Sequence, residues 1–242
     1  MTGQPTLAVV TGASSGIGAA FARKLAALGH EVLLVARRED RLRALSEEIR
    51  RTGASAQVHA CDLSDPEATR RLCERLRGEE RLRVLVHAAG FGVTGPVGEA
   101  DAERLEDMAQ VHVNATIALT SAVVPVLRRA GEGRVVVVSS IAGWLFGTGS
   151  ATYCATKAFE TSYTRSLSRE LGGSACAPWP CVPDTRVRSS TTRRNTPTGI
   201  AARSLPGCGT PPRTSRRSPG RPSSVETRSA CLVWSTASWC SP

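Results

Sequence analysis

Short apolar runs alternate with amphipathic stretches along the first 171 residues of the chain. The apolar runs predict strands, at residues 7–10, 31–36, 57–61, 84–87 and 134–139. The stretches with a helical period predict helices, at residues 19–28, 39–51, 66–76, 101–127 and 152–171. The strand-like runs are continuously apolar, which is typical of parallel strands covered on both faces. The pattern therefore predicts the α/β class, with a doubly wound parallel sheet and helices on both faces.

The first apolar run ends at a glycine-rich turn, TGASSGIG, over residues 11–18. Gly12, Gly16 and Gly18 lie between a predicted strand and a predicted helix. Glycines let the backbone turn tightly and approach a pyrophosphate, whose charge faces the helix N-terminus. A plain turn or helix cap is the alternative, and the strand–turn–helix context argues against it. We therefore expect a dinucleotide to be bound here, by Gly12, Ser14, Ser15, Gly16, Ile17 and Gly18.

The end of the second apolar run bears on the choice of cofactor. Sites for NAD place an acid there, which bonds the ribose 2′-hydroxyl. This chain has Arg37 and Arg38 instead, and a guanidinium suits a 2′-phosphate. The alternative is a solvated basic start to the next helix. We predict that NADP(H) is preferred over NAD(H), with Arg37 as the main phosphate contact and Arg38 beside it.

These motifs resemble the short-chain dehydrogenase/reductase (SDR) family, and the resemblance covers residues 1–173. Residues 61–63 (CDL) resemble the family's adenine-contacting segment, which implies contacts from Asp62 and Leu63. Residues 87–90 (HAAG) resemble its NNAG element, which implies contacts from Ala89 and Gly90. Both asparagines are replaced, by His87 and Ala88, and we expect this to weaken a contact that supports the central sheet. The resemblance implies a Rossmann-like NAD(P)-binding oxidoreductase domain that forms dimers or tetramers.

Four further residues resemble the catalytic tetrad of that family. Tyr153 and Lys157 are four residues apart in a predicted helix, so both lie on one face. Ser140 precedes Tyr153 by 13 residues, and spacing favours it over Ser139. Asn114 lies in the preceding long helix. The order and spacing behind a glycine turn make the combination specific, although Tyr-x-x-x-Lys alone is a weak motif.

The expected chemistry explains these residue types. Hydride transfer to a ketone or aldehyde builds negative charge on its oxygen, which calls for a proton donor and hydrogen bonds. Tyr153 would be the general acid, or the base in alcohol oxidation, and Lys157 would lower the pKa of its phenol and bond the nicotinamide ribose. Ser140 would hold the substrate oxygen. The resemblance implies that Asn114 helps to hold a water that relays protons to Lys157.

The substrate is expected to be a small carbonyl or alcohol compound, since that is the chemistry the tetrad serves. Residues 144–146 (WLF) follow the serine and indicate an apolar pocket wall, although they could equally be core. In the family that these motifs resemble, elements after residue 173 line the rest of the pocket, and they are not readable in this sequence. The sequence therefore does not specify the substrate itself.

Charge and composition divide the chain near residue 173. Residues 1–173 hold 21 basic and 19 acidic residues, whereas residues 174–242 hold ten arginines and two acids. The second part also holds ten of the 14 prolines, five of the eight cysteines and 12 serines. It shows neither helical nor strand periodicity. We therefore predict an SDR domain at 1–173 and a non-family segment at 174–242, with the sixth strand and the Pro-Gly turn of the family unreadable.

A shift of reading frame accounts for that segment better than a disordered basic tail. Reading residues 174–183 back into degenerate codons and starting two bases later permits GVRAMALCPG, which resembles the missing strand and Pro-Gly turn. The same offset over residues 230–241 permits an apolar, strand-like end. A one-base deletion near codon 173 explains both. The alternative to an active enzyme is therefore an inactive frameshifted product that at most binds nucleotide.

The sequence also predicts where the protein acts and what it does not bind. We find no basic, apolar leader and no apolar stretch of about 18 residues, which predicts a cytoplasmic protein without a membrane partner. Histidines and cysteines show no zinc spacing, so no metal is expected. The arginine-rich tail has no lysine and no stacking motif, so no nucleic-acid partner is expected.

Overall fold

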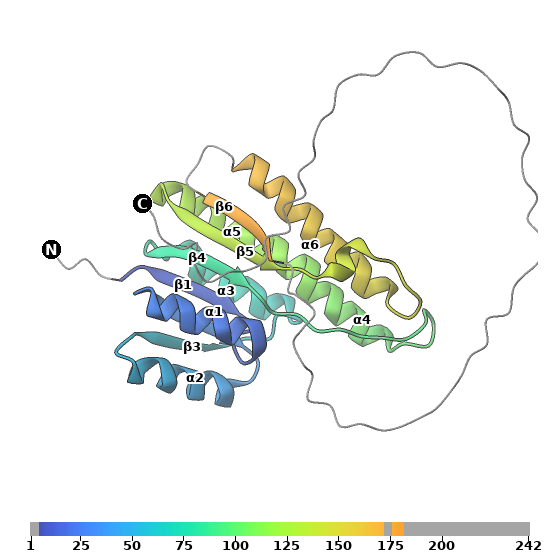
Figure 1. Cartoon of the computed structure of the whole chain (residues 1–242), viewed down its shortest axis with the longest axis horizontal. Coiled ribbons are helices and arrows are strands. Elements are labelled where there is room, and N and C mark those ends of the chain that lie inside the picture. Colours follow the sequence, from blue (N-terminus) through green and yellow to red (C-terminus); the bar gives the residue numbers. More distant parts are fainter. Residues whose placement is uncertain (1–4, 172–175, 182–242) are drawn as a thin grey trace, which may run out of the picture. The chain divides into compact units, whose positions relative to one another are not determined.

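The computed structural model describes residues 5–171 and 176–181 of the chain. Six parallel strands form one sheet in the order β3-β2-β1-β4-β5-β6 (Figure 1). The strands are β1 (Leu7–Thr11), β2 (Glu31–Ala36), β3 (Ala56–Ala60), β4 (Leu82–His87), β5 (Gly133–Val138) and β6 (Cys176–Cys181). Every strand predicted from the apolar runs is present, and the doubly wound parallel sheet is confirmed.

Helices follow the strands in alternation. They are α1 (Gly16–Ala27), α2 (Glu39–Arg51), α3 (Pro66–Arg77), α4 (Ala102–Ala109), α5 (Ala115–Ala130) and α6 (Ala151–Glu170), with a π-helical segment η1 (Gln110–Asn114) and a 3-10 turn η2 (Ile141–Trp144). Capping fixes several boundaries. The Asp65 carboxylate accepts the Glu67 N–H at 2.8 Å where α3 begins, with Pro66 at its first position. Gly131, with φ 73°, ends α5.

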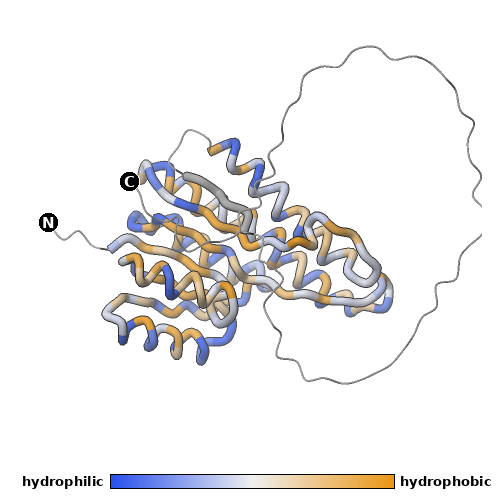
Figure 2. Tube along the Cα trace, in the orientation of Figure 1, coloured by the Kyte–Doolittle hydropathy of each residue, from blue (hydrophilic) through white to orange (hydrophobic). Residues whose placement is uncertain are grey.

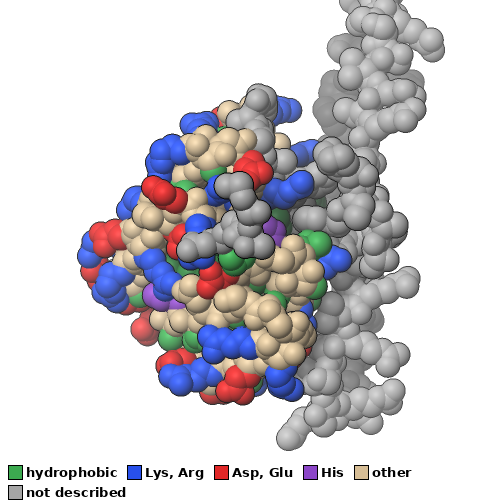
Figure 3. Space-filling view, turned by 90° about the vertical axis from the view of Figure 1, so that its left-hand side faces the viewer, with side chains coloured by type: hydrophobic (Ala, Val, Ile, Leu, Met, Phe, Trp, Pro, Cys, Tyr) green, Lys and Arg blue, Asp and Glu red, His purple; other side chains and the backbone are tan. Residues whose placement is uncertain are grey.

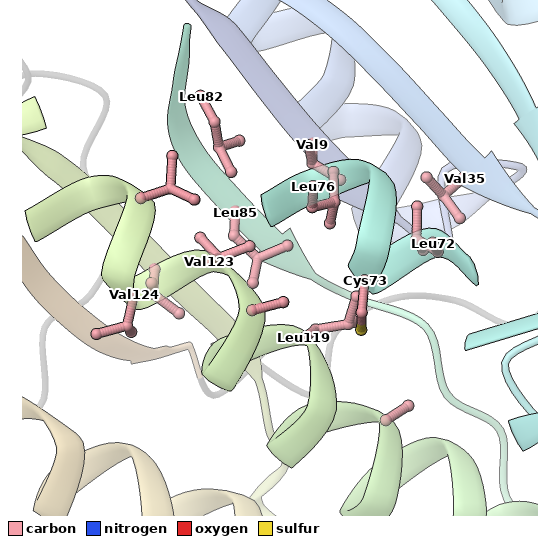
Figure 4. Packing of buried hydrophobic residues seen from close by; sticks show 14 of the residues in the cluster. Val9, Val35, Leu72, Cys73, Leu76, Leu82, Leu85, Leu119, Val123 and Val124 are labelled. Atoms are coloured by element: carbon pink, nitrogen blue, oxygen red, sulfur yellow. The ribbon is translucent and has the colours of Figure 1, made fainter. Parts of the chain in front are cut away.

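The sheet is buried on both faces because successive strand residues point in opposite directions. In β1, Leu7 and Val9 pack against α3 and α5, whereas Ala8 and Val10 pack against α1 and α2. Figure 4 shows the first of these layers, where Leu72 and Cys73 of α3 and several α5 residues meet β1 and β4. The hydropathy colouring of Figure 2 follows the same division, with apolar strands inside and hydrophilic positions on the outer sides of α2 and α3.

A long apolar helical run crosses this core. Residues 102–130, which comprise α4, η1 and α5, are long and apolar enough to cross a membrane by length and composition alone, contrary to our expectation that no such stretch exists. In the structure 61% of that apolar window is buried inside the fold. A core helix passes the same test, and α5 supplies much of the core shown in Figure 4.

The structure corrects the prediction that no sixth strand follows residue 173. β6 pairs in parallel with β5, from Gly133 opposite Cys176 to Val138 opposite Cys181. Pro178 and Pro180 have no N–H and are two residues apart, so both leave donors missing on the same side of the strand. The ladder to β5 must therefore use the backbone donors at 177, 179 and 181, which leaves the two proline nitrogens on the outer edge of the strand, where a missing donor is tolerated. Sequence periodicity missed the strand because proline breaks the usual pattern.

The predicted division of the chain at residue 173 stays a prediction. Backbone contacts group Met1–Ser189 as one unit and Ser190–Pro242 as another. The frameshift prediction for residues 182–242 falls outside the described residues.

Candidate active site

The glycine turn occupies the carboxyl end of β1. Gly12 and Gly16 have φ of 67° and 55°, a left-handed conformation that glycine adopts without strain. A Cβ on Gly12 would lie 2.6 Å from the Ala88 carbonyl oxygen, and one on Gly18 would collide with the Gly12 carbonyl oxygen. A Cβ on Gly16 would meet nothing within 4 Å. Gly12 and Gly18 are therefore required by packing, while Gly16 leaves an open approach to the backbone.

The N-terminus of α1 suits an anion. Its first turn holds no acidic residue, and its N-cap, Ser15, makes no side-chain cap hydrogen bond. The N–H groups at the start of a helix carry partial positive charge and bind phosphates. The turn therefore fits the pyrophosphate of a dinucleotide.

The two arginines after β2 take different partners. Arg38 donates from Nη2 to the hydroxyl oxygens of Ser14 and Ser15, at 2.9 and 3.0 Å. Arg37 forms a looser ion pair with Asp62, with Nη1 3.7 Å from Oδ2. Asp62 also accepts hydrogen bonds from the N–H and hydroxyl of Ser64. Arg38 is thus the arginine that reaches the glycine turn, whereas Arg37 lies beside the residue predicted to contact adenine. Leu63 is buried.

His87 connects β4 to its neighbours. Its Nδ1 lies 2.8 Å from the Thr11 hydroxyl, which accepts the Ala89 N–H at 3.2 Å, and its Nε2 lies 3.2 Å from the Val111 carbonyl oxygen. A single neutral tautomer satisfies all three contacts, with Nε2 protonated. Burial lowers the pKa of His87 to about 4, so the ring is neutral at physiological pH. Histidine thus supplies contacts to both neighbouring elements at this position, and whether they are weaker than those of an asparagine stays a prediction.

Tyr153 and Lys157 lie one turn apart near the start of α6. A Cβ on Gly90 would lie 3.5 Å from Lys157 Nζ, and one on Gly92 would lie 3.9 Å from the Tyr153 ring. Since Gly12 packs on Ala88 and Ala89, the glycine turn and the pair on α6 flank one short segment, residues 88–92. The glycine turn and the Tyr153–Lys157 pair, predicted from distant parts of the sequence, thus lie around one strip of backbone.

The two serines after β5 have different surroundings. Ser139 is buried, with its hydroxyl 2.9 Å from the Lys157 carbonyl oxygen and 2.8 Å from the Thr161 hydroxyl. Ser140 is partly exposed, and its hydroxyl oxygen accepts the Ala142 N–H at 3.2 Å as the cap of η2. Ser139 therefore ties β5 to α6. Ser140 uses its hydroxyl oxygen as an acceptor, and the preference for it over Ser139 as the substrate contact stays a prediction.

Comparison with known proteins decides the family. The family model of the short chain dehydrogenases matches residues 6–190. The chain belongs to the short-chain dehydrogenase family. It is 34% identical over 170 residues to an uncharacterized oxidoreductase of Staphylococcus saprophyticus, covering 69% of this chain and 73% of that one.

Other relatives are enzymes of the same kind. A very-long-chain 3-oxoacyl-CoA reductase from Podospora anserina is 35% identical over 172 residues, which cover 69% of this chain and 50% of the relative. A metagenomic short-chain oxidoreductase solved in complex with NADP superposes with a TM-score of 0.69 at 36% identity, covering 74% of this chain and 82% of that one. The protein is therefore an SDR oxidoreductase, and it spans between half and three quarters of the length of these curated relatives.

Asn114 stands apart from the other three members of the predicted SDR tetrad. Its side-chain amide donates to Gln110 Oε1 at 2.7 Å, and it lines a surface hollow together with Ser64, Glu103 and Asp107. The structure thus places Tyr153 and Lys157 one turn apart on α6 and Ser139 against the Lys157 backbone, and directs the Asn114 side chain to a surface hollow. Its role in a proton relay stays a prediction.

His112, two residues before Asn114, is the η1 residue whose side chain lies beside Tyr153. Its Nε2 accepts the Phe91 N–H at 3.3 Å, and its Nδ1 lies 2.9 Å from the Thr156 hydroxyl, which donates to the Tyr153 carbonyl oxygen at 3.0 Å. The ring meets Tyr153 edge-on, with 6.0 Å between centroids. Burial, then the nearby Lys157 charge, lowers the pKa of His112 to about 3. Our sequence reasoning missed this residue, although a histidine within an otherwise apolar helical stretch was a signal.

Glu160 is the second residue that our sequence reasoning missed. It is 1% exposed and holds Lys157 through both carboxylate oxygens, 2.9 and 3.1 Å from Nζ. Burial raises the pKa of Glu160 to about 7 against the opposing effect of the Lys157 charge. The signal was available, since residues 157 and 160 share a helix face and an acid there must be paired when buried.

Proposed function

We propose that this SDR protein is an NADP(H)-dependent oxidoreductase that interconverts a ketone or aldehyde and the corresponding alcohol, with Tyr153 as general acid and base. The observation that carries the proposal is the placement of Tyr153 and Lys157 against residues 88–92, the strip on which the glycine turn also packs. That arrangement allows a dinucleotide whose pyrophosphate lies on the α1 N-terminus to extend toward the phenol. Substrate and reaction direction depend on the whole protein's pocket.

The preference for NADP(H) rests on the two arginines and on a relative. Arg37 and Arg38 put two guanidinium groups at the end of β2, and Arg38 already contacts the turn serines. A ribose 2′-phosphate near Ser14 and Ser15 would therefore meet a cation. The similar metagenomic oxidoreductase was solved with NADP. NAD(H) would lack the phosphate that these cations can bind, so it is the weaker cofactor.

Each site residue has a chemical task in carbonyl reduction. When bound, the nicotinamide ring supplies the hydride. Tyr153 donates its phenolic proton to the carbonyl oxygen as negative charge builds there, and its phenolate regains a proton from solvent. The Lys157 ammonium favours that phenolate by charge, and Ser140 donates a hydrogen bond to the same substrate oxygen. In alcohol oxidation the proton movements reverse.

Removal of one phenol tests the assignment. Tyr153→Phe keeps the ring and should still bind NADPH, while turnover of a panel of ketones and aldehydes falls about 100-fold or more. The matched control is Tyr163→Phe, which removes the other tyrosine hydroxyl of α6, bonded to Thr120 at 2.8 Å. Loss of NADPH absorbance measures turnover, on the printed chain and on a version with the frame restored near codon 173. Equal turnover by Tyr153→Phe and Tyr163→Phe would refute the role of Tyr153.

A further inference from the structure

The Lys157 ammonium is fully engaged by protein acceptors. Its Nζ lies 3.1 and 2.9 Å from the two Glu160 oxygens and 3.2 Å from the Val138 carbonyl oxygen. An ammonium has three N–H donors, and these three acceptors can use all of them. Under the proposed function the same group must also bond the cofactor ribose and stabilise the Tyr153 phenolate. It can do so only by releasing at least one present acceptor.

Glu160 is the acceptor that matters most, because it is buried and, above its raised pKa of about 7, charged. The pair is 7% and 1% exposed at its two side chains, so water screens the attraction little. The groups that act on the carboxyl are Lys157 on its own helix and Ser139 at the end of β5. The Lys157 charge also lowers the pKa values of His112 of η1 and His87 of β4, and burial keeps both rings neutral. Two neutral histidines therefore lie near the ammonium, and Glu160 is the acid that it contacts.

The geometry points to Glu160 as a positioning residue, which holds the Lys157 ammonium away from the cofactor ribose and from Tyr153 and offsets its charge. This inference rests on the proposed function, since it concerns the lysine of that site. Glu160 touches none of the reacting atoms. Cofactor binding then includes the cost of loosening a buried ion pair, and the phenol of Tyr153 experiences a lysine charge that Glu160 partly neutralises.

Glu160→Gln tests this with little change in shape. The amide keeps one carbonyl oxygen for Nζ but removes the charge, so the ammonium becomes easier to redirect. At about pH 8, where Glu160 is ionised because its pKa is about 7, NADPH, titrated by its fluorescence, should bind about tenfold more tightly, the change that corresponds to about 1.4 kcal/mol. The Tyr153 phenolate absorbance should then appear at lower pH in Glu160→Gln than in the parent, because the lysine charge that favours the phenolate is no longer offset.

The tyrosine measurement needs no substrate. The chain has two tyrosines, so the phenolate absorbance of each protein minus that of its Tyr153→Phe counterpart reports Tyr153 alone. Glu170→Gln is the matched control, since it removes an exposed carboxylate from the last position of α6. It should change neither the NADPH affinity nor the Tyr153 titration. Circular dichroism establishes that each variant is folded, and Glu160→Asp, which keeps the charge, should resemble the parent more than Glu160→Gln does.

A double-mutant cycle separates positioning from a merely structural role. In a Lys157→Met background, Glu160→Gln should no longer change NADPH affinity or the Tyr153 pKa, because its effect passes through the ammonium. Persistence of the full effect without Lys157 would overturn the inference. A second outcome would also overturn it: Glu160→Gln binds NADPH more weakly and forms the Tyr153 phenolate at higher pH than the parent. Glu160 would then serve to keep the lysine charged. A parent chain that binds no NADPH would instead refute the proposed function.

Discussion

The buried histidines and Glu160 should give this protein a particular dependence of stability on pH. His87 and His112 have pKa values of about 4 and about 3 in the folded state, below their ordinary value of 6.5. Unfolding therefore takes up a proton at each ring once the pH is below 6.5, and acid favours unfolding. Glu160 has the opposite sign. Its folded pKa of about 7 exceeds the ordinary 4.5, so unfolding releases its proton, and its contribution to stability is lost as the pH rises from 4.5 to 7.

The magnitudes follow from linkage. Between pH 4.5 and 6.5 each histidine changes the free energy of unfolding by up to about 1.4 kcal/mol per pH unit, or about 2 kcal/mol across the window, because the titration is partial at its ends. Glu160 opposes one of the two over the same window. These three groups together should make the folded state up to about 1.4 kcal/mol more stable for each unit by which the pH rises. Other shifted groups add to the slope in parent and variants alike, so they cancel in the differences.

Urea unfolding followed by circular dichroism at several pH values between 4.5 and 6.5 measures these slopes. His87→Gln and His112→Gln should each flatten the parent slope by about one proton, and Glu160→Gln should steepen it by about one proton. Overall loss of stability in a variant does not obscure the result, because the slope and not the intercept is compared. Parallel slopes in the parent and all three variants would contradict the assignment of neutral, buried imidazoles and a protonated Glu160.

Two further predictions concern the cofactor and the end of the chain. NADPH should bind more tightly than NADH, and Arg37→Asp should reverse that order, with removal of a guanidinium–phosphate contact costing about 1.5–3 kcal/mol. Arg38→Ala should weaken NADPH about tenfold or more and leave NADH nearly unchanged; equal affinities of the parent for both cofactors would exclude a phosphate contact. Resequencing near codon 173 should find a missing base, and restoring it should raise turnover and protease resistance; an unaltered gene sequence would remove the frameshift hypothesis.

Local patterns were sufficient for much of the fold. The predicted bounds of the helix at 39–51 and the strand at 31–36 match α2 and β2, because a helical apolar stripe and a doubly buried strand each leave a period in the sequence. The glycine turn was equally readable, since Gly12 and Gly18 are fixed by contacts with nearby backbone that no side chain could share. The geometry of the glycine turn therefore followed from sequence spacing.

The buried polar residues of the site could not be predicted from the sequence pattern. Asn114 and His112 are two residues apart within η1, where the backbone leaves the α-helical period. Helical phase therefore could not tell which of them faces Tyr153, and the structure places His112 there. Glu160 was missed for a different reason. Its burial depends on α6 packing across the end of β5, a contact between elements that no local window contains.

The position of β6 in the sheet bears on the hypothesis of a reading-frame shift near codon 173. The position beside β5 is a parallel edge with a row of backbone groups to satisfy, and CAPWPC can fill it only with its prolines turned outward. Such a strand offers no complete ladder of donors to a further strand on its outer side, so the sheet would end there. The residues permitted by the shifted frame, GVRAMALC, carry an N–H at every position and are mostly apolar, which suits a covered strand. If the frameshift hypothesis holds, this segment would lie beside β5 and would leave donors for a further strand, as the resemblance to the family implies.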